Sequence, residues 1–281
     1  MRVIREGIGF VAPEQSLFSL YQSGAELLAQ AGATGEAIDL LREGIERIPA
    51  EHSLFSLYQS AAEMLAHLGE AGEAVDLLRM GIGCIKPQHS LFVLYQEASG
   101  ILARQGDYPG ALDLLKDGLR RIPPGKWGRE RIGEGALYLC LGLRSASRIE
   151  ELVSGQGLLA GDEHSRLLGQ VFIQEIAGQW RDAAERAGAA RERLPRYLHF
   201  ALHEAFAWLC AGEPGRAAEA MDRFPGGLRL GARESKSWLA AFIAFVQGDS
   251  TAARESLAAY LDQPLEATAA PERETLLRLW D

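Results

Sequence analysis

The segment SLFSLYQS at residues 16–23 recurs unchanged at 53–60, and SLFVLYQE follows at 90–97. The interval is 37 residues both times. Aligning 14–50 with 51–87 gives 24 identities over 37 positions, and the following unit keeps the same skeleton with more changes. A fixed period of this length is typical of proteins in which each unit buries its apolar face against its neighbours. The sequence therefore predicts a stack of similar units.

Each unit contains two helical segments separated by a glycine and closed by a proline. In the second unit Leu54, Leu57, Tyr58, Ala61 and Leu65 recur at helical spacing. A serine stands where an N-cap is expected, a glycine where a left-handed C-cap is expected, and a proline where the second helix must stop. In chain order these residues are Ser16, Ser53 and Ser90; Gly32, Gly69 and Gly106; and Pro49, Pro87 and Pro123.

The third unit resembles the tetratricopeptide repeat family in its segment QGDYPGALDLLKDGLRRIPP. The residues that match the turn glycine, the two small packing positions, the large apolar position and the closing proline are Gly106, Ala111, Gly118, Leu115 and Pro123. GQWRDAAERAGAARERLP, at 178–195, is similar again. Two features depart from the family. The period here is 37 residues, whereas the family's usual period is 34, and glycine stands in the second helix where the family usually has alanine. That glycine costs up to about 1 kcal/mol of helix propensity, which we expect closer helix approach to offset.

This resemblance implies an all-α fold, a right-handed superhelical solenoid of antiparallel helix hairpins. The expected parts are an orphan second helix of a partial repeat at 1–13, three regular repeats at 14–124, a degenerate helical repeat at 125–161, further helix pairs at 162–261, and a loop with a C-terminal capping helix at 262–281. The orphan helix has two explanations: a lone capping helix, or a chain cut from a longer array. In the second case uncovered apolar residues such as Ile4 and Ile8 favour self-association.

The family's geometry places particular first-helix residues on the concave face, where a partner binds. By the matches above these are Ser19, Gln22, Glu26 and Gln30; Ser56, Gln59, Glu63 and His67; Val93, Gln96, Gly100 and Arg104; and, in later units, Leu168, Phe172, Leu202 and Phe206. The glutamines repeat once per unit and form a predicted ladder of amides able to hold an extended backbone. The alternatives are that the polar residues are only solvated, and that the apolar ones belong to the core.

Composition excludes several classes of function. The chain has 281 residues, is 47% hydrophobic and 24% charged, and carries a formal net charge of −9. An acidic balance argues against a duplex nucleic acid or an anionic membrane as the main partner. Three scattered cysteines indicate a reducing compartment. No apolar run approaches the roughly 20 residues of a membrane span, and no secretory signal is visible, so we expect a cytoplasmic protein.

Catalytic and metal-binding patterns are weak. His199 and His203 share a helix face, but zinc needs a third ligand, and Phe200 stands where the hydrolase pattern has glutamate. We found no glycine-rich phosphate loop and no nucleophile with a plausible base. The sequence therefore predicts a non-catalytic protein with no cofactor and no metal. A metal-dependent enzyme and a single-stranded RNA-binding array stay open as remote alternatives.

The function that follows is protein binding. We expect the concave groove to hold a partner protein or an extended peptide through a preformed surface. A variant of this expectation is that the chain is the sensor or docking region of a larger effector or regulator.

Overall fold

The computed structural model describes residues 16–49, 54–86, 90–126 and 128–223, with a few positions between 244 and 255. These residues form twelve α-helices and contain no strand, which is the predicted all-α class. The helices are α2 (Ser16–Gln30), α3 (Thr34–Arg47), α4 (Phe55–His67), α5 (Ala71–Cys84), α6 (Leu91–Arg104), α7 (Tyr108–Arg121), α8 (Arg129–Gly142), α9 (Ala146–Val153), α10 (Glu163–Ile176), α11 (Trp180–Arg193), α12 (His199–Cys210) and α13 (Pro214–Asp222). The chain divides into two compact units, Met1–Ile132 and Gly133–Asp281.

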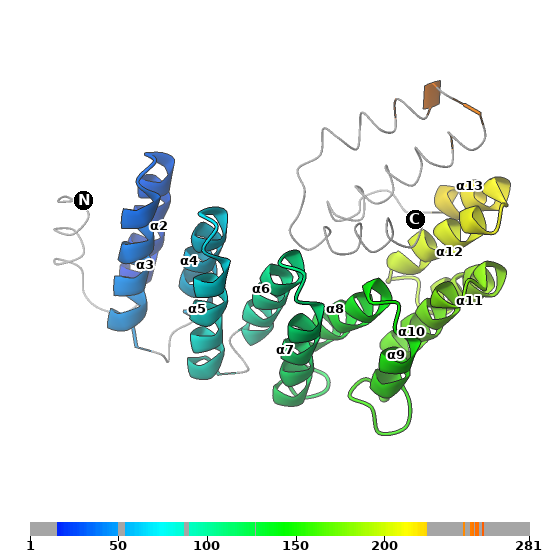
Figure 1. Cartoon of the computed structure of the whole chain (residues 1–281), viewed down its shortest axis with the longest axis horizontal. Helices are drawn as coiled ribbons and strands as arrows, with labels where there is room; N and C mark the ends of the chain where they lie inside the picture. The colour runs from blue at the N-terminus through cyan, green and yellow to red at the C-terminus, as the bar shows by residue number, and fades with distance from the viewer. Residues whose placement is uncertain are drawn as a thin grey trace. The chain divides into compact units, whose positions relative to one another are not determined.

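Unit 1 contains three stacked helix hairpins, α2–α3, α4–α5 and α6–α7 (Figure 1). The two helices of each hairpin pack together, and each second helix packs on the first helix of the next hairpin. The first helices α2, α4 and α6 also contact one another in sequence. The predicted repeat of antiparallel helix pairs is therefore confirmed in this unit, and its first helices form a row.

Each hairpin of unit 1 turns at the predicted glycine. Gly32, Gly69 and Gly106 have φ angles of 80°, 86° and 83°, in the left-handed region that glycine adopts without strain. The N–H of Ala33, one residue beyond Gly32, donates to the Leu28 carbonyl five residues back at 2.9 Å. Equivalent bonds close the other two turns. These are Schellman caps, so the glycines end the first helices as predicted.

The degenerate repeat at 125–161 has the same turn without the glycine. Arg144 lies between α8 and α9 with a φ of 52°. The N–H of Ser145 donates to the Cys140 carbonyl at 3.0 Å, as in the regular turns. A left-handed conformation is costly for a residue with a Cβ, so the turn is strained at Arg144. The turn of this segment is therefore regular, whereas its second helix, α9, is shorter than those of unit 1.

The second-helix glycines of unit 1 admit an aromatic ring. A Cβ atom built on Gly44 is 2.7 Å from Cγ of Tyr21, and one built on Gly81 is 2.8 Å from Cγ of Tyr58. Gly118 repeats the arrangement against Tyr95 at 3.1 Å. Real Cβ atoms essentially never make contacts as short as those at Gly44 and Gly81. The contact at Gly118 is slightly longer and is tight. At Gly44 and Gly81 a larger residue would force the tyrosine ring to move, because the ring lies directly on the helix backbone.

The hydroxyl ends of these tyrosines reach the same second helices. Tyr21 Oη donates to Glu43 Oε1 at 3.2 Å, and Tyr95 Oη donates to Asp117 Oδ2 at 2.6 Å. The middle unit has Met80 at the position of these acids. Burial, with Cys84 nearby, raises the pKa of Tyr58 to about 12. The ring contact is thus shared by all three units, and the hydrogen bond from the tyrosine to an acidic side chain by two.

The predicted serine caps are wrong where the structure describes them. Ser90 precedes α6 with a φ of 57°, and its side chain makes no capping hydrogen bond. Ser16 is the first residue of α2 itself. Asp107 on α7 and Asp162 on α10 do cap their helices, because each accepts from the backbone N–H three residues on. Three predicted features lie outside the described residues: the cap at Ser53, the orphan helix at 1–13 with Ile4 and Ile8, and the C-terminal segment at 262–281.

Unit 2 continues the hairpin pattern. α10 packs on α9 and α11, and α12 packs on α11 and α13. Gly178 and Gly212 turn their hairpins with φ angles of 71° and 77°. Ala183, Ala187 and Ala190 on α11 are buried, which matches their predicted role as small packing residues. Among the described helices none is both long and apolar enough to span a bilayer.

Candidate functional site

The first-helix surface of unit 1 carries most of the residues predicted to bind a partner. All ten of these predicted polar residues reach solvent. Ser19, Glu26, Gln30, His67 and Arg104 are exposed, and Gln22, Ser56, Gln59, Glu63 and Gln96 are half-buried. They lie on α2, α4 and α6, the helices that form the row described above. Their part in binding stays a prediction.

A charged cluster joins α4 and α6 on this surface. Gln59 Nε2 donates to Glu63 Oε1 at 3.0 Å, which fixes the glutamate. Glu97, which the repeat pattern did not single out, points into the same region with its side chain only 14% exposed. Its carboxylate is 3.8 Å from Arg104 Nη2, too long for a hydrogen bond. His67 also acts on Glu97 electrostatically.

Glu97 is held in an unfavourable environment for a carboxylate. Burial raises its pKa above the ordinary value of 4.5, and the nearby Glu63 charge raises it further. Arg104 and His67 lower it, by less. In this cluster burial and the Glu63 charge act on Glu97 more strongly than the two cationic groups, Arg104 and His67. Sequence comparison of the units missed Glu97 because Ser23 and Ser60 occupy its place in the other two.

The apolar residues predicted for the groove belong to the core instead. Phe172 on α10 and Phe206 on α12 are 0% exposed, and Leu168 and Leu202 are buried too. Phe172 lies against Tyr138 of α8, with ring centroids 4.9 Å apart. Such packing leaves no face for a partner. The expectation that Phe172 and Phe206 contact a partner is therefore corrected.

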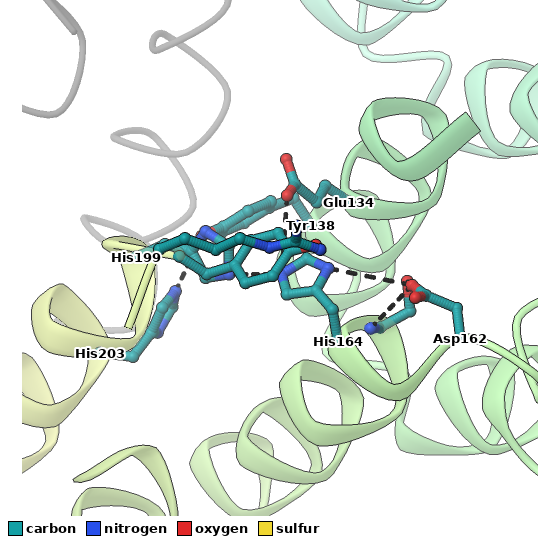
Figure 2. Close-up of polar contacts among 9 residues, drawn as sticks. Glu134, Tyr138, Asp162, His164, His199 and His203 are labelled. Carbon is teal, nitrogen blue, oxygen red and sulfur yellow. Dashed lines mark hydrogen bonds and ion pairs between the residues drawn. The ribbon is translucent and has the colours of Figure 1, made fainter. Parts of the chain in front are cut away.

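Unit 2 contains a histidine cluster that the sequence did not predict (Figure 2). His164 on α10 and His199 on α12 meet with their Nε2 atoms 2.7 Å apart. Glu134 on α8 has Oε1 3.6 Å from His164 Nε2. Tyr197 stacks on the His164 ring at 3.8 Å between centroids. Three successive first helices thus contribute one ligand-type side chain each to one location.

His203 forms a separate, buried chain of hydrogen bonds beside this cluster. Its Nδ1 is 2.8 Å from Glu175 Oε1, and its Nε2 is 3.0 Å from the Tyr138 hydroxyl. His203 and Glu175 are both 0% exposed. Donation from Nδ1 to the carboxylate leaves Nε2 to accept from Tyr138. His199 and His203 share a helix, yet they serve different groups of partners.

The two clustered imidazoles are held neutral. Burial lowers the pKa of His164 to about 4, against a smaller raising effect of Asp162. Burial also lowers the pKa of His199 well below 6.5, and His164 and His203 lower it further. Neutral rings keep lone pairs on nitrogen, which is the state that accepts protons or binds metals.

The fold is similar to that of a solved tetratricopeptide repeat protein from Parabacteroides merdae ATCC 43184. The TM-score is 0.56 with 12% sequence identity, and the match covers 94% of this chain and 99% of that one. No protein-family model matches the sequence. No curated protein matches it either. The likeness is one of fold: a helical repeat of tetratricopeptide type.

Proposed function

We propose that the first-helix surface of unit 1 binds an extended segment of another protein that carries lysine or arginine side chains. The fold supports this because helical repeats offer a long, preformed surface and lose little conformational entropy on binding. In the same proposal the 37-residue unit is a long variant of the tetratricopeptide repeat.

The side chains of the surface support a polar, extended ligand. Gln22, Gln59 and Gln96 recur once per hairpin on adjacent first helices, and all three are half-buried. Each amide offers donors and an acceptor, so a row of them can pair with an extended backbone. Their partial burial restricts the number of rotamers that binding must freeze.

The charge of the surface supports a cationic ligand, and this is the observation that carries the proposal. Glu63 and Glu97 lie close enough for one carboxylate to raise the pKa of the other. Glu26 adds a third, exposed carboxylate on α2. A lysine or arginine placed between Glu63 and Glu97 relieves their repulsion and forms charge-assisted hydrogen bonds. An acidic ligand gains neither effect.

The test is a peptide library of fixed length and extended composition in which the net charge runs from negative to positive. Fluorescence anisotropy measures the affinity for the full chain. We expect the cationic peptides to bind best, with a salt dependence that the acidic ones lack. Changing Glu63 and Glu97 together to glutamine is expected to weaken the affinity for cationic peptides by about 10-fold or more, since each charge-assisted bond contributes about 1.5–3 kcal/mol.

A matched control removes two carboxylates elsewhere. Glu36 and Glu46 are exposed on α3, the second helix of the first hairpin. The Glu36→Gln, Glu46→Gln variant has the same net charge as the test variant and is expected to keep the affinity. Equal weakening in both variants, or no preference for cationic peptides, contradicts the proposal.

A further inference from the structure

We propose that Glu134, His164 and His199 of unit 2 form a binding site for a zinc ion. Each residue offers one ligand atom, and these atoms all lie within 4.8 Å of one another. Figure 2 shows the His164 and His199 side chains close together, with the Glu134 carboxylate nearby. Two imidazole nitrogens and one carboxylate oxygen are a common ligand set for zinc, with a fourth position left for solvent.

The distances fit a single ion with small side-chain adjustments. Zinc binds imidazole nitrogen and carboxylate oxygen at about 2.0–2.2 Å, so tetrahedral ligands lie about 3.3 Å apart. The distance from His164 Nε2 to Glu134 Oε1 is 3.6 Å, close to that value. The two Nε2 atoms, at 2.7 Å, must separate slightly. His199 lies at the first position of α12, so a small rotation of its side chain supplies this movement.

The hydrogen bonds within the cluster leave one buried nitrogen of His164 without a partner among the described residues. His164 is 2% exposed, and its Nδ1 makes no hydrogen bond to any residue that the structure describes. One shared proton between the two Nε2 atoms is the only bond that joins the rings. When that proton moves from Nε2 to Nδ1 of the same ring, both Nε2 lone pairs point toward one position, where a zinc ion can bind both nitrogens.

Charged groups of both signs surround the site. Asp162 Oδ2 lies 3.9 Å from His164 Nδ1, where a small movement makes the carboxylate–histidine pair that orients metal-bound histidines. Glu134 and Asp162 supply negative charge. Arg196, which lies over the Tyr197 ring at 4.6 Å, and the positive ends of α10 and α12 oppose it. His203 is excluded as a ligand because Tyr138 and Glu175 engage both of its nitrogens.

The test uses untagged full-length protein, stripped with a chelator and titrated with zinc chloride by calorimetry. We expect one zinc ion per chain, a rise in melting temperature on binding, and no comparable effect of magnesium, which prefers oxygen ligands. Cobalt(II) is expected to give the intense visible absorption of a tetrahedral site. Glu134→Gln and His199→Ala are each expected to weaken zinc binding by more than about 100-fold, beyond the 10–100-fold typical of residues outside the ligand set.

The matched control is Glu36→Gln, which removes an exposed carboxylate of α3 in unit 1. It is expected to leave zinc binding unchanged. Asp162→Asn keeps the helix cap but removes the charge, and is expected to weaken binding by about 10-fold. Far-ultraviolet circular dichroism checks that each variant is folded. Zinc binding by the folded Glu134→Gln and His199→Ala variants at the wild-type affinity, or no zinc bound by the wild type, overturns the proposal.

Discussion

Single residues in unit 1 are constrained by rings that lie on helix backbones. Gly81 faces both the Tyr58 ring and Cδ1 of Leu94, an apolar side chain of the next hairpin. Its absent side chain therefore serves two contacts, one within the unit and one between units. This is a physical reason for a glycine in the middle of a helix, where propensity alone disfavours it.

Gly81→Ala is expected to destabilise the protein by about 1–3 kcal/mol. The added methyl group must displace the Tyr58 ring and Leu94, and overpacking of this kind outweighs the gain in helix propensity. Urea unfolding followed by circular dichroism measures the change.

Gly83→Ala is the control on the same helix. A Cβ built there has no atom within 4 Å, so only the helix propensity changes. We expect a stabilisation of up to about 1 kcal/mol. Destabilisation of equal size at both positions would show that the Tyr58 contact is not the cause.

At the scale of elements, the hairpins were predictable because local signals and the repeat agree. Helical spacing and the turn glycines fall at the same places in three successive units, and a proline closes each unit within one residue of the same place. The α8–α9 hairpin could not be predicted as well, since Arg144 occupies the left-handed position where glycine marks the other turns. Backbone strain of this kind leaves no mark in composition or spacing.

Arg144→Gly tests whether that strain is real. Glycine adopts a φ of 52° without strain, whereas arginine is strained at this angle because of its Cβ. After allowing for the greater freedom of glycine in the unfolded chain, we expect a stabilisation of about 0.5–1 kcal/mol.

Arg144→Ala is the informative comparison, because alanine removes the same side chain but keeps the Cβ. It is expected to give no gain in the free energy of unfolding. If alanine stabilises as much as glycine, the side chain and not the backbone is responsible.

The candidate sites also differ in how well the sequence predicts them. The first-helix surface was found from the sequence because it repeats every 37 residues. Glu97 was missed because it breaks the repeat. The histidine cluster was missed because Glu134, His164 and His199 come from three different helices, 30 and 35 residues apart. Only packing brings such residues together, and a search within one helix finds His203, which belongs elsewhere.

At the scale of the whole molecule, the acidic balance makes stability depend on pH. The formal net charge is −9, and carboxylates that lie close together repel once both are ionised. Glu97 is the described carboxylate in which this effect coincides with burial. Its protonation therefore links the charge of the molecule to its folding.

Glu97→Gln is expected to raise the free energy of unfolding at pH 7 and to have little effect near pH 4. The pKa of Glu97 is raised in the folded state, so folding favours the protonated form. Stability is lost as the pH rises from the ordinary pKa of 4.5 through the raised one, and stays low above it. Glutamine removes that loss. Parallel urea titrations at the two pH values measure the difference between variant and wild type.

The control is Glu36→Gln, an exposed glutamate on α3. It is expected to give the same small change at both pH values. A Glu97→Gln variant that is less stable than wild type at pH 7 would mean that the Arg104 contact outweighs burial.

The pairing of tyrosine with glycine has a consequence for how such an array evolves. Tyr21 with Gly44, Tyr58 with Gly81 and Tyr95 with Gly118 each lie inside one 37-residue block. Unequal recombination that inserts or deletes 37 codons, at any phase within the block, therefore restores a ring opposite a glycine in every copy. The gene can change its number of hairpins in a single event, with no compensating point mutation needed to keep the helices in contact.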